Sequence, residues 1–300
     1  MAGVRAAVRG SVLVPVDPAT LVPLDAVPVT EPEAVEEAIA EARLAAETWA
    51  RSDHPTRAAL LGRVAHELVD ADAEIAETIV AETGKPLAEA YTHDLLVAAE
   101  ALAWLSRHAG RVLAPERLRL NRLLLPQKRG WLSYDPLGAV AVIAPWNVPL
   151  GVSLSQVATA VAAGNAALLK PSELTPATGA WVEELFARAG APPGLVRVVQ
   201  GPGATVGAQL VGHRGIGGIV FTGSTETGRE VASRAAQRLC PILLELGGSD
   251  PMLVLDDADL ERAVQGALWG AFANCGQVCA GVERIDVARP LHAECVERLS

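Results

Sequence analysis

Residues 136–169 read PLGAVAVIAPWNVPLGVSLSQVATAVAAGNAALL and carry no charged side chain. An apolar stretch of ~20 residues is long enough for a membrane-spanning helix. This stretch is interrupted, however, by residues that break or polarise such a helix: Pro136, Pro145, Asn147, Pro149, Gln156, Gly164 and Asn165. We therefore expect a buried strand, a loop, a buried helix and a second strand, and no membrane span.

Short apolar runs recur along the rest of the chain. Together with the two runs of the opening stretch they are Ala139–Ala144, Ala166–Leu169, Leu195–Val199, Gly218–Thr222 and Ile242–Leu246. Segments of helical composition separate most of these runs, which predicts βαβ units and a parallel sheet. Because such sheets bind ligands at the carboxyl ends of their strands, we expect the functional residues directly after each run.

The N-terminal part of the chain is expected to be helical. Thr30 and Glu33 have the spacing of a capping box, and the apolar positions 35, 38, 39 and 42 then share one helix face. A second helix is expected from near Pro55 to just before Gly84, and a third over 87–109 with Gly110 as its end.

The composition excludes several classes of protein. Half of the 300 residues are hydrophobic, which is incompatible with a disordered chain. The net charge of −10, from 25 basic and 35 acidic residues, argues against general nucleic-acid binding. The four cysteines lie in a chain that starts without a signal peptide, so we expect free thiols and a cytoplasmic protein.

Two motifs follow the first two apolar runs. In Pro145-Trp146-Asn147 the Asn amide can donate a hydrogen bond to a developing oxyanion, although a Pro/Asn turn with Trp146 in the core explains the same residues. After the second run, Lys170 and Glu173 can hydrogen-bond a ribose, and a helix start capped by Ser172 is the alternative.

Lysine is rare in this chain, because arginine supplies nearly all of the basic residues. The lysines are Lys85, Lys128 and Lys170. Each lysine therefore stands out against a bias toward arginine.

Residues 221–228, FTGSTETG, form a Gly/Ser/Thr-rich turn that leads into a predicted helix. The free N–H groups of a helix N-terminus suit a pyrophosphate. The segment matches neither GxGxxG nor a P-loop, since Arg229 stands where the P-loop lysine belongs. A plain capped helix explains it equally well.

The last two motifs are Glu245-Leu246-Gly247-Gly248 and the segment from Asn274 to Gly281, NCGQVCAG. A Glu buried at the end of a strand can serve as a general base, and a solvent-facing Glu is the alternative. A Cys between small residues can be stabilised as a thiolate, whereas most cysteines are structural thiols. A further alternative is a zinc site made of Cys275, Cys279, His292 and Cys295.

Taken in order, these motifs resemble those of the aldehyde dehydrogenase superfamily. The matching segments are Pro145–Asn147, Lys170–Glu173, Phe221–Gly228, Glu245–Gly248 and Gly276–Cys279. Their order and spacing agree with the family, and the likeness runs from about Thr30 to the end of the chain. The resemblance implies an α/β fold, with a Rossmann-like parallel-sheet cofactor domain, N-terminal helices and the start of a second α/β catalytic domain.

The resemblance also implies roles in the oxidation of a small-molecule aldehyde. Cys279 corresponds to the nucleophile that forms a thiohemiacetal and then a thioester. Asn147, with the backbone N–H of Cys279, corresponds to the oxyanion hole, and Glu245 to the base that activates water. An acidic residue at Glu245 also argues against the CoA-acylating branch of the family.

Further residues correspond to the family's cofactor contacts. Lys170 and Glu173 resemble the pair that holds the adenine ribose. The carboxylate at Glu173 repels a 2′-phosphate, so NAD is expected rather than NADP. The pyrophosphate contact falls to Ser224 and the surrounding turn, which includes Gly223 and Gly228, and the residue that lines the cofactor path is Trp146.

The implied domain division places residues 1–116 and 138–248 in the NAD-binding domain. Residues 117–137 resemble the bridging segment that joins subunits, and residues 249–300 an incomplete catalytic domain that carries the nucleophile. This chain ends before the family's Glu-x-Phe-Gly-Pro motif and its C-terminal oligomerisation strand. The homo-oligomer of the family is therefore not extended to this chain, and apolar surface near Leu253, Leu255, Trp269 and Phe272 is expected to lack cover.

Three functions remain open from the sequence. The chain is part of an NAD-dependent aldehyde dehydrogenase, or a truncated remnant that binds NAD without turnover, or a zinc-stabilised interaction protein. The identity of the aldehyde is not encoded in these motifs.

Overall fold

A five-stranded parallel sheet forms the centre of the molecule in the computed structural model, which describes residues 7–9, 11–121 and 123–300. The strands lie in the order β10-β9-β6-β7-β8, and every neighbouring pair is parallel. Their bounds are β6 Ala139–Ile143, β7 Ala166–Lys170, β8 Val196–Val198, β9 Ile216–Thr222 and β10 Ile242–Glu245. All residues of β6 and β7 are buried, as apolar strands covered on both faces require. The predicted α/β class and the predicted strands are confirmed.

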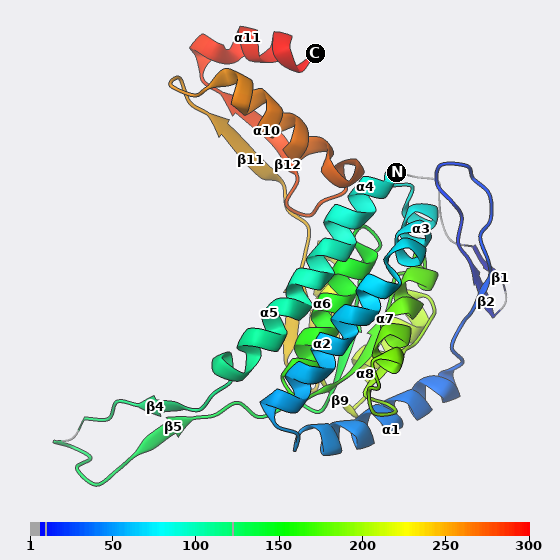
Figure 1. The fold of residues 1–300 in the computed structure, drawn as a ribbon, viewed down its shortest axis with the longest axis vertical. Coiled ribbons are helices and arrows are strands. Elements are labelled where there is room, and N and C mark those ends of the chain that lie inside the picture. The colour runs from blue at the N-terminus through cyan, green and yellow to red at the C-terminus, as the bar shows by residue number, and fades with distance from the viewer. Residues whose placement is uncertain (1–6, 10, 122) are drawn as a thin grey trace.

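Helices cover both faces of this sheet (Figure 1). One face packs against α1 (Pro32–Trp49), α8 (Ala208–Gly212) and α9 (Thr225–Ala236). The other packs against α6 (Pro149–Ala162) and α7 (Pro176–Arg188), over which lie α2 (His54–Asp70), α3 (Asp72–Thr83) and α5 (Leu96–Val112). The buried helix and strands predicted within residues 136–169 are therefore confirmed as β6, α6 and β7.

The predicted capping box at the start of α1 is wrong. The N-cap is Glu31, and no side chain caps this helix. The Thr30 hydroxyl instead accepts a hydrogen bond from the Gln200 backbone N–H at 2.9 Å, which ties this end of the chain to the loop after β8. The predicted apolar face is confirmed, because positions 35, 38, 39 and 42 are all buried.

The second and third predicted helices are each divided. Ala71 separates α2 from α3, and Gly84 ends α3 with φ 72°, as predicted. A short helix α4 (Leu87–Glu89) and a π-helical segment (Ala90–Leu95) precede α5. Gly110 lies inside α5 and does not end it. A Cβ at Gly110 would lie 3.1 Å from the Cβ of His54, so packing explains this glycine better than helix termination.

Three smaller elements project from or flank the central body (Figure 1). A β-hairpin is made of β4 (Glu116–Leu118) and β5 (Gly130–Leu132). The N-terminal part pairs β1 (Ala7–Arg9), β2 (Val12–Val14) and β3 (Val27–Pro28). The C-terminal lobe consists of parallel β11 (Asp250–Val254) and β12 (Val282–Val287) with α10 (Leu260–Phe272) and α11 (Arg289–Leu299).

The C-terminal lobe has a small core and a large exposed apolar surface. Its buried cluster consists of Leu260, Val264 and Cys295. Trp269 and Phe272 are 70% and 69% exposed, and Leu253 and Leu255 are exposed as well. The uncovered surface expected from the sequence is therefore present.

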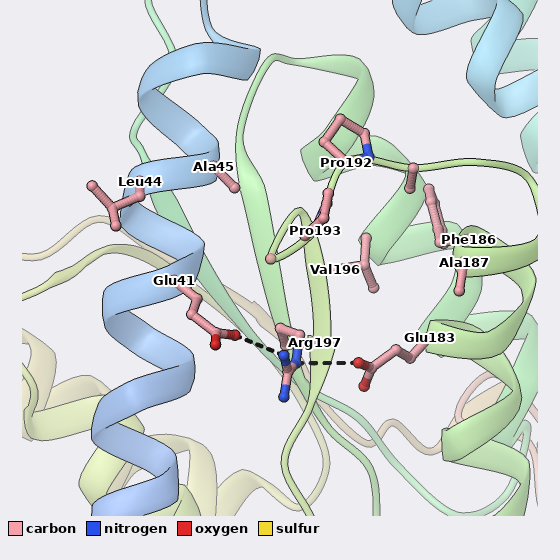
Figure 2. A pocket seen from close by; sticks show the side chains of 12 residues that line it. Glu41, Leu44, Ala45, Glu183, Phe186, Ala187, Pro192, Pro193, Val196 and Arg197 are labelled. Atoms are coloured by element: carbon pink, nitrogen blue, oxygen red, sulfur yellow. Dashed lines mark hydrogen bonds and ion pairs between the residues drawn. The ribbon is translucent and has the colours of Figure 1, made fainter.

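Arg197 of β8 joins two helices at the edge of the sheet (Figure 2). Its guanidinium lies 2.6 Å from a carboxylate oxygen of Glu41 in α1 and 3.1 Å from one of Glu183 in α7. Glu183 also accepts the backbone N–H of Val198, which occupies one donor of this edge strand. The groove of about 390 Å³ around these residues thus lies where α1, α7 and β8 are held together by ion pairs.

Within the described residues, no helix has the length and apolar character that crossing a bilayer demands.

Candidate active site

A cavity of about 480 Å³ lies at the carboxyl ends of β6, β7 and β9. Loops that follow these three strands supply its walls, as expected for a parallel sheet. The predicted residues that line it are Trp146, Lys170, Glu173, Gly223 and Ser224. The sheet therefore brings together side chains that are separated by up to about eighty positions in the sequence.

Lys170 ends β7 with its side chain buried at 2% exposure. Its Nζ donates to the Pro171 carbonyl at 2.6 Å and lies 3.4 Å from a carboxylate oxygen of Glu173, which is 39% exposed. Burial lowers the pKa of Lys170, and the Glu173 carboxylate opposes that effect. The two side chains form a salt bridge at the cavity wall, and Glu173 is its more exposed partner.

The N-terminus of α9 forms another part of the wall. Ser224 is the N-cap, and its Oγ accepts the Thr227 backbone N–H at 3.2 Å. Gly223 donates its N–H to the Glu245 carbonyl at 3.1 Å, which connects this turn to β10. The helix start that was the plain alternative for this motif is thus present, and it faces the cavity.

Gly228, which was predicted to contact the cofactor, does not line this cavity. A Cβ at this position would lie 2.6 Å from Cδ2 of Leu246, so the glycine lets α9 approach the chain after β10. Packing accounts for Gly228, and a direct contact to a cofactor remains a prediction from the resemblance.

A second groove, of about 260 Å³, adjoins the first and contains Asn147, Glu245 and Cys279. These residues come from the loop after β6, the end of β10 and the loop before β12. Trp146, Gly223 and Ser224 line both spaces, so the groove opens beside the cavity at the sheet edge. The three residues predicted to perform chemistry are brought together.

Hydrogen bonds tie the Asn147 loop to the Cys279 loop. Nδ2 of Asn147 donates to the Gln277 carbonyl at 2.7 Å. The Asn147 carbonyl accepts from Nζ of Lys85 at 2.8 Å and from Nδ2 of Asn274 at 2.9 Å. Since an amide nitrogen carries two N–H groups, Asn147 retains a second donor for the groove.

Of the two alternatives for Glu245, a buried base and a solvent-facing side chain, the structure has the second, because this residue is exposed. The physical reason is the position of β10 at the edge of the sheet, where β9 is its neighbour. The residues of β10 alternate between partly buried and exposed. Glu245 nevertheless lines the groove with Cys279. The loop that follows approaches the segment that carries Cys279 closely, since a Cβ at Gly248 would lie 3.0 Å from the Cys279 carbonyl oxygen.

The four cysteines are free and differ in exposure. Cys275 and Cys279 are exposed, Cys240 is partly buried and Cys295 is buried. Burial raises the pKa of Cys240, and burial together with the Glu89 carboxylate raises the pKa of Cys275. Cys279 is therefore the exposed thiol that lines the groove of Asn147 and Glu245.

The alternative zinc site has no counterpart in the structure. Cys295 belongs to the apolar cluster of the C-terminal lobe. In the part of the chain that is described, no group of three or more His, Cys, Asp or Glu side chains is arranged to hold a metal ion.

Sequence reasoning missed three buried residues at or near this site. Lys85 and Asn274 contact the Asn147 carbonyl, and Asp94 pairs with Lys85. Lys85 and Asp94 form an ion pair beneath the Asn147 loop, and Asn274 is fully buried in the segment that leads to Cys279. The rarity of lysine pointed to Lys85. Nothing in the sequence pattern distinguished Asp94 or Asn274.

The chain is similar to known proteins in sequence and in fold. A family model described as the aldehyde dehydrogenase family matches residues 8–300. A curated relative, 4,4'-diapolycopene aldehyde oxidase from Methylomonas sp, is 40% identical over 267 residues, which are 89% of this chain and 50% of that protein. The chain spans about half the length of the curated relatives it matches.

Solved structures match over nearly the whole chain. An NAD⁺ complex of an aldehyde dehydrogenase from Bacillus cereus has a TM-score of 0.91 and 32% identity. The match covers 97% of this chain and 58% of the chain of that enzyme. An E. coli NADP-dependent enzyme has a TM-score of 0.92 and 32% identity, with 97% and 59% covered.

Proposed function

Because the chain belongs to the aldehyde dehydrogenase family, we propose that the protein oxidises an aldehyde to a carboxylic acid with NAD as acceptor. The observation that carries this proposal is the common groove of Asn147, Glu245 and Cys279 beside the Lys170–Glu173 cavity. A nucleophile, an oxyanion donor and a base within one groove are the parts that this reaction needs.

The first step belongs to Cys279. Its thiolate attacks the aldehyde carbonyl, and the carbon–sulfur bond forms as the carbonyl oxygen becomes an oxyanion. The free N–H of the Asn147 amide and the backbone N–H of Cys279 stabilise this oxyanion. When bound, NAD supplies the acceptor for the hydride that leaves the thiohemiacetal carbon.

The second step belongs to Glu245. Loss of hydride leaves a thioester on Cys279, which water must hydrolyse. The Glu245 carboxylate takes a proton from this water, the new hydroxyl attacks the thioester carbonyl, and the carbon–sulfur bond breaks. The acid leaves and the thiol is restored.

The cavity fits a dinucleotide by its donors and by its position. Lys170 and Glu173 present an ammonium and a carboxylate suited to ribose hydroxyls, and Ser224 stands at a helix N-terminus suited to pyrophosphate. The solved relatives include both an NAD⁺ complex and an NADP-dependent enzyme. We propose NAD because the Glu173 carboxylate repels the 2′-phosphate of NADP.

NADH formation with a panel of short, aromatic and semialdehyde substrates tests the proposal. Cys279→Ala is expected to abolish NADH formation, whereas Cys275→Ala retains it. Glu245→Gln is expected to give one burst of NADH per site and little turnover, because acylation continues and hydrolysis stops.

Two results would contradict this function. Activity that survives Cys279→Ala would show that Cys279 is not the nucleophile. NAD binding, seen as a change in tryptophan fluorescence, without NADH from any aldehyde would favour a binding module that lacks turnover.

A further inference from the structure

A buried ion pair lies beneath the loop that carries Asn147. Nζ of Lys85 is 2.7 Å from Oδ2 of Asp94, and the two side chains are 1% and 0% exposed. Lys85 follows the end of α3, and Asp94 lies in the π-helical segment before α5. Burying two charges is costly unless their remaining hydrogen-bonding atoms are satisfied, so the other partners of this pair are informative.

Asp94 caps a helix that belongs to another part of the chain. Its Oδ1 accepts the backbone N–H groups of Leu150 and Gly151, both at 3.0 Å. These are the first turn of α6, whose own N-cap residue Val148 supplies no side-chain bond. A carboxylate at this position satisfies orphan donors and meets the positive end of the helix dipole.

The π-helical segment allows this approach. A Cβ at Gly151 would lie 3.0 Å from the His93 carbonyl oxygen and 3.3 Å from Cα of Asp94, so glycine permits close contact between the segment and α6. π-Helical turns are rare and occur frequently at functional sites. The segment that contains Asp94 therefore lies directly against the start of α6.

Lys85 connects this ion pair to Asn147, the proposed oxyanion donor. Besides Asp94, its Nζ donates to the Asn147 carbonyl at 2.8 Å. Asn274 donates to the same carbonyl oxygen at 2.9 Å and to the Gln277 carbonyl at 3.2 Å. Two buried donors thus fix the backbone from which the Asn147 side chain extends, and Gln277 holds that side chain at its far end.

We propose that Lys85 and Asp94 are positioning residues that hold the Asn147 amide at the angle needed to bind the oxyanion. This inference rests on the proposed function for the role of Asn147. Neither residue lines the groove, so their effect on the reaction passes through the Asn147 backbone and α6. An oxyanion donor acts only when it points at the developing charge, and small misplacements weaken it strongly.

A double-mutant cycle tests the coupling in turnover. Lys85→Met is expected to lower kcat about 10- to 100-fold while KM for aldehyde and the NAD affinity change less than about threefold. In an Asn147→Ala background the same substitution is expected to change kcat less than about twofold, because the residue it positions is gone. An equal loss in both backgrounds would overturn the proposal.

Lys85→Met leaves the buried Asp94 carboxylate without its ion-pair partner and can unfold the protein. A second variant is therefore needed to separate a loss of stability from a loss of positioning. Lys85→Met combined with Asp94→Asn removes both charges and keeps an oxygen that can cap α6. Its predicted kcat loss is of the same order. Arg57→Met is the matched control, because Arg57 is a buried cation whose bonds go to the end of α1 and to α6 far from Asn147. It is expected to lower stability and leave kcat unchanged.

A second measurement does not require activity. In an amide-correlated NMR spectrum of the chain, the Asn147 side-chain signals are those lost in Asn147→Ala. They are expected to shift or broaden in the Lys85/Asp94 variant and to stay in place in Arg57→Met. Unmoved signals, or equal movement in the Arg57 control, would overturn the positioning role. A chain that makes no NADH but shows the expected shifts would contradict the proposed function alone.

Discussion

Gly179 provides a sharp test of how α7 packs on Pro171, in the loop that follows β7. A Cβ built at this position would lie 2.4 Å from both Cβ and Cγ of Pro171, about 1 Å inside ordinary contact. The proline ring cannot rotate away, and its carbonyl is held by Lys170 at 2.6 Å. Gly179→Ala must therefore push α7 away from the loop after β7.

The magnitude follows from two opposing effects. Alanine favours a helix over glycine by about 1 kcal/mol, whereas overpacking costs about 1–3 kcal/mol. Gly62→Ala is the matched control, because Gly62 lies inside α2 with no atom within 4 Å of the new Cβ. The helix term is common to both variants. Their free energies of unfolding should thus differ by about 1–3 kcal/mol, with Gly62→Ala the more stable.

Urea titration of the two variants measures this difference from midpoints and slopes. NAD affinity serves as a second readout, since displacement of the loop that carries Pro171 and Glu173 is expected to weaken binding in Gly179→Ala alone. Equal stability of the two variants would refute the close packing of α7 on Pro171.

Three further predictions concern charge and ionisation. Glu173→Ser is expected to raise the NADP-to-NAD ratio of kcat/KM by about tenfold or more, because the repelling carboxylate is gone; an unchanged ratio would contradict the assignment. At neutral pH iodoacetamide should alkylate Cys279 before Cys275, since burial and the Glu89 carboxylate raise the pKa of Cys275, and peptide mapping with and without NAD would show the reverse order if this were wrong. Burial raises the pKa of Glu82 from 4.5, so the stability from its neutral form is complete below pH 4.5 and declines as pH rises through the folded-state pKa. The free energy of unfolding of the wild type, relative to Glu82→Gln, should accordingly fall with rising pH in urea titrations, and a constant difference would exclude this role.

Secondary structure near the N-terminus shows where local patterns fail. The spacing of Thr30 and Glu33 fits a capping box, yet the Thr30 hydroxyl bonds to Gln200 instead. Glycine is typical of a helix end, yet Gly110 lies inside α5, at a point where the helix packs closely against His54. In both cases a partner distant in the sequence decided between two locally acceptable structures.

Burial of the site residues could not be derived from the motifs either. The motif left Glu245 open between a buried and a solvent-facing side chain. Because β10 lies at the edge of the sheet, the residue is exposed. Lys170 was open between a ribose contact and a solvated side chain, and the structure buries it. Burial depends on the position of each strand in the sheet, which the pattern of a single strand does not contain.

The sequence by itself determined the parallel sheet and the ends of its strands as the place of the candidate site. Apolar runs long enough for buried strands, separated by helical segments, permit few other arrangements, and ligands gather at one edge of such a sheet. The order of the motifs also placed Asn147 and Cys279 on loops and Glu245 at the end of a strand. Only the tertiary structure decided that these residues share one groove, and that Lys85 and Asp94 lie beneath it. The physical reason is that hydrogen bonds between distant segments, such as that of Lys85 to the Asn147 carbonyl, form only once the sheet and its helices have packed.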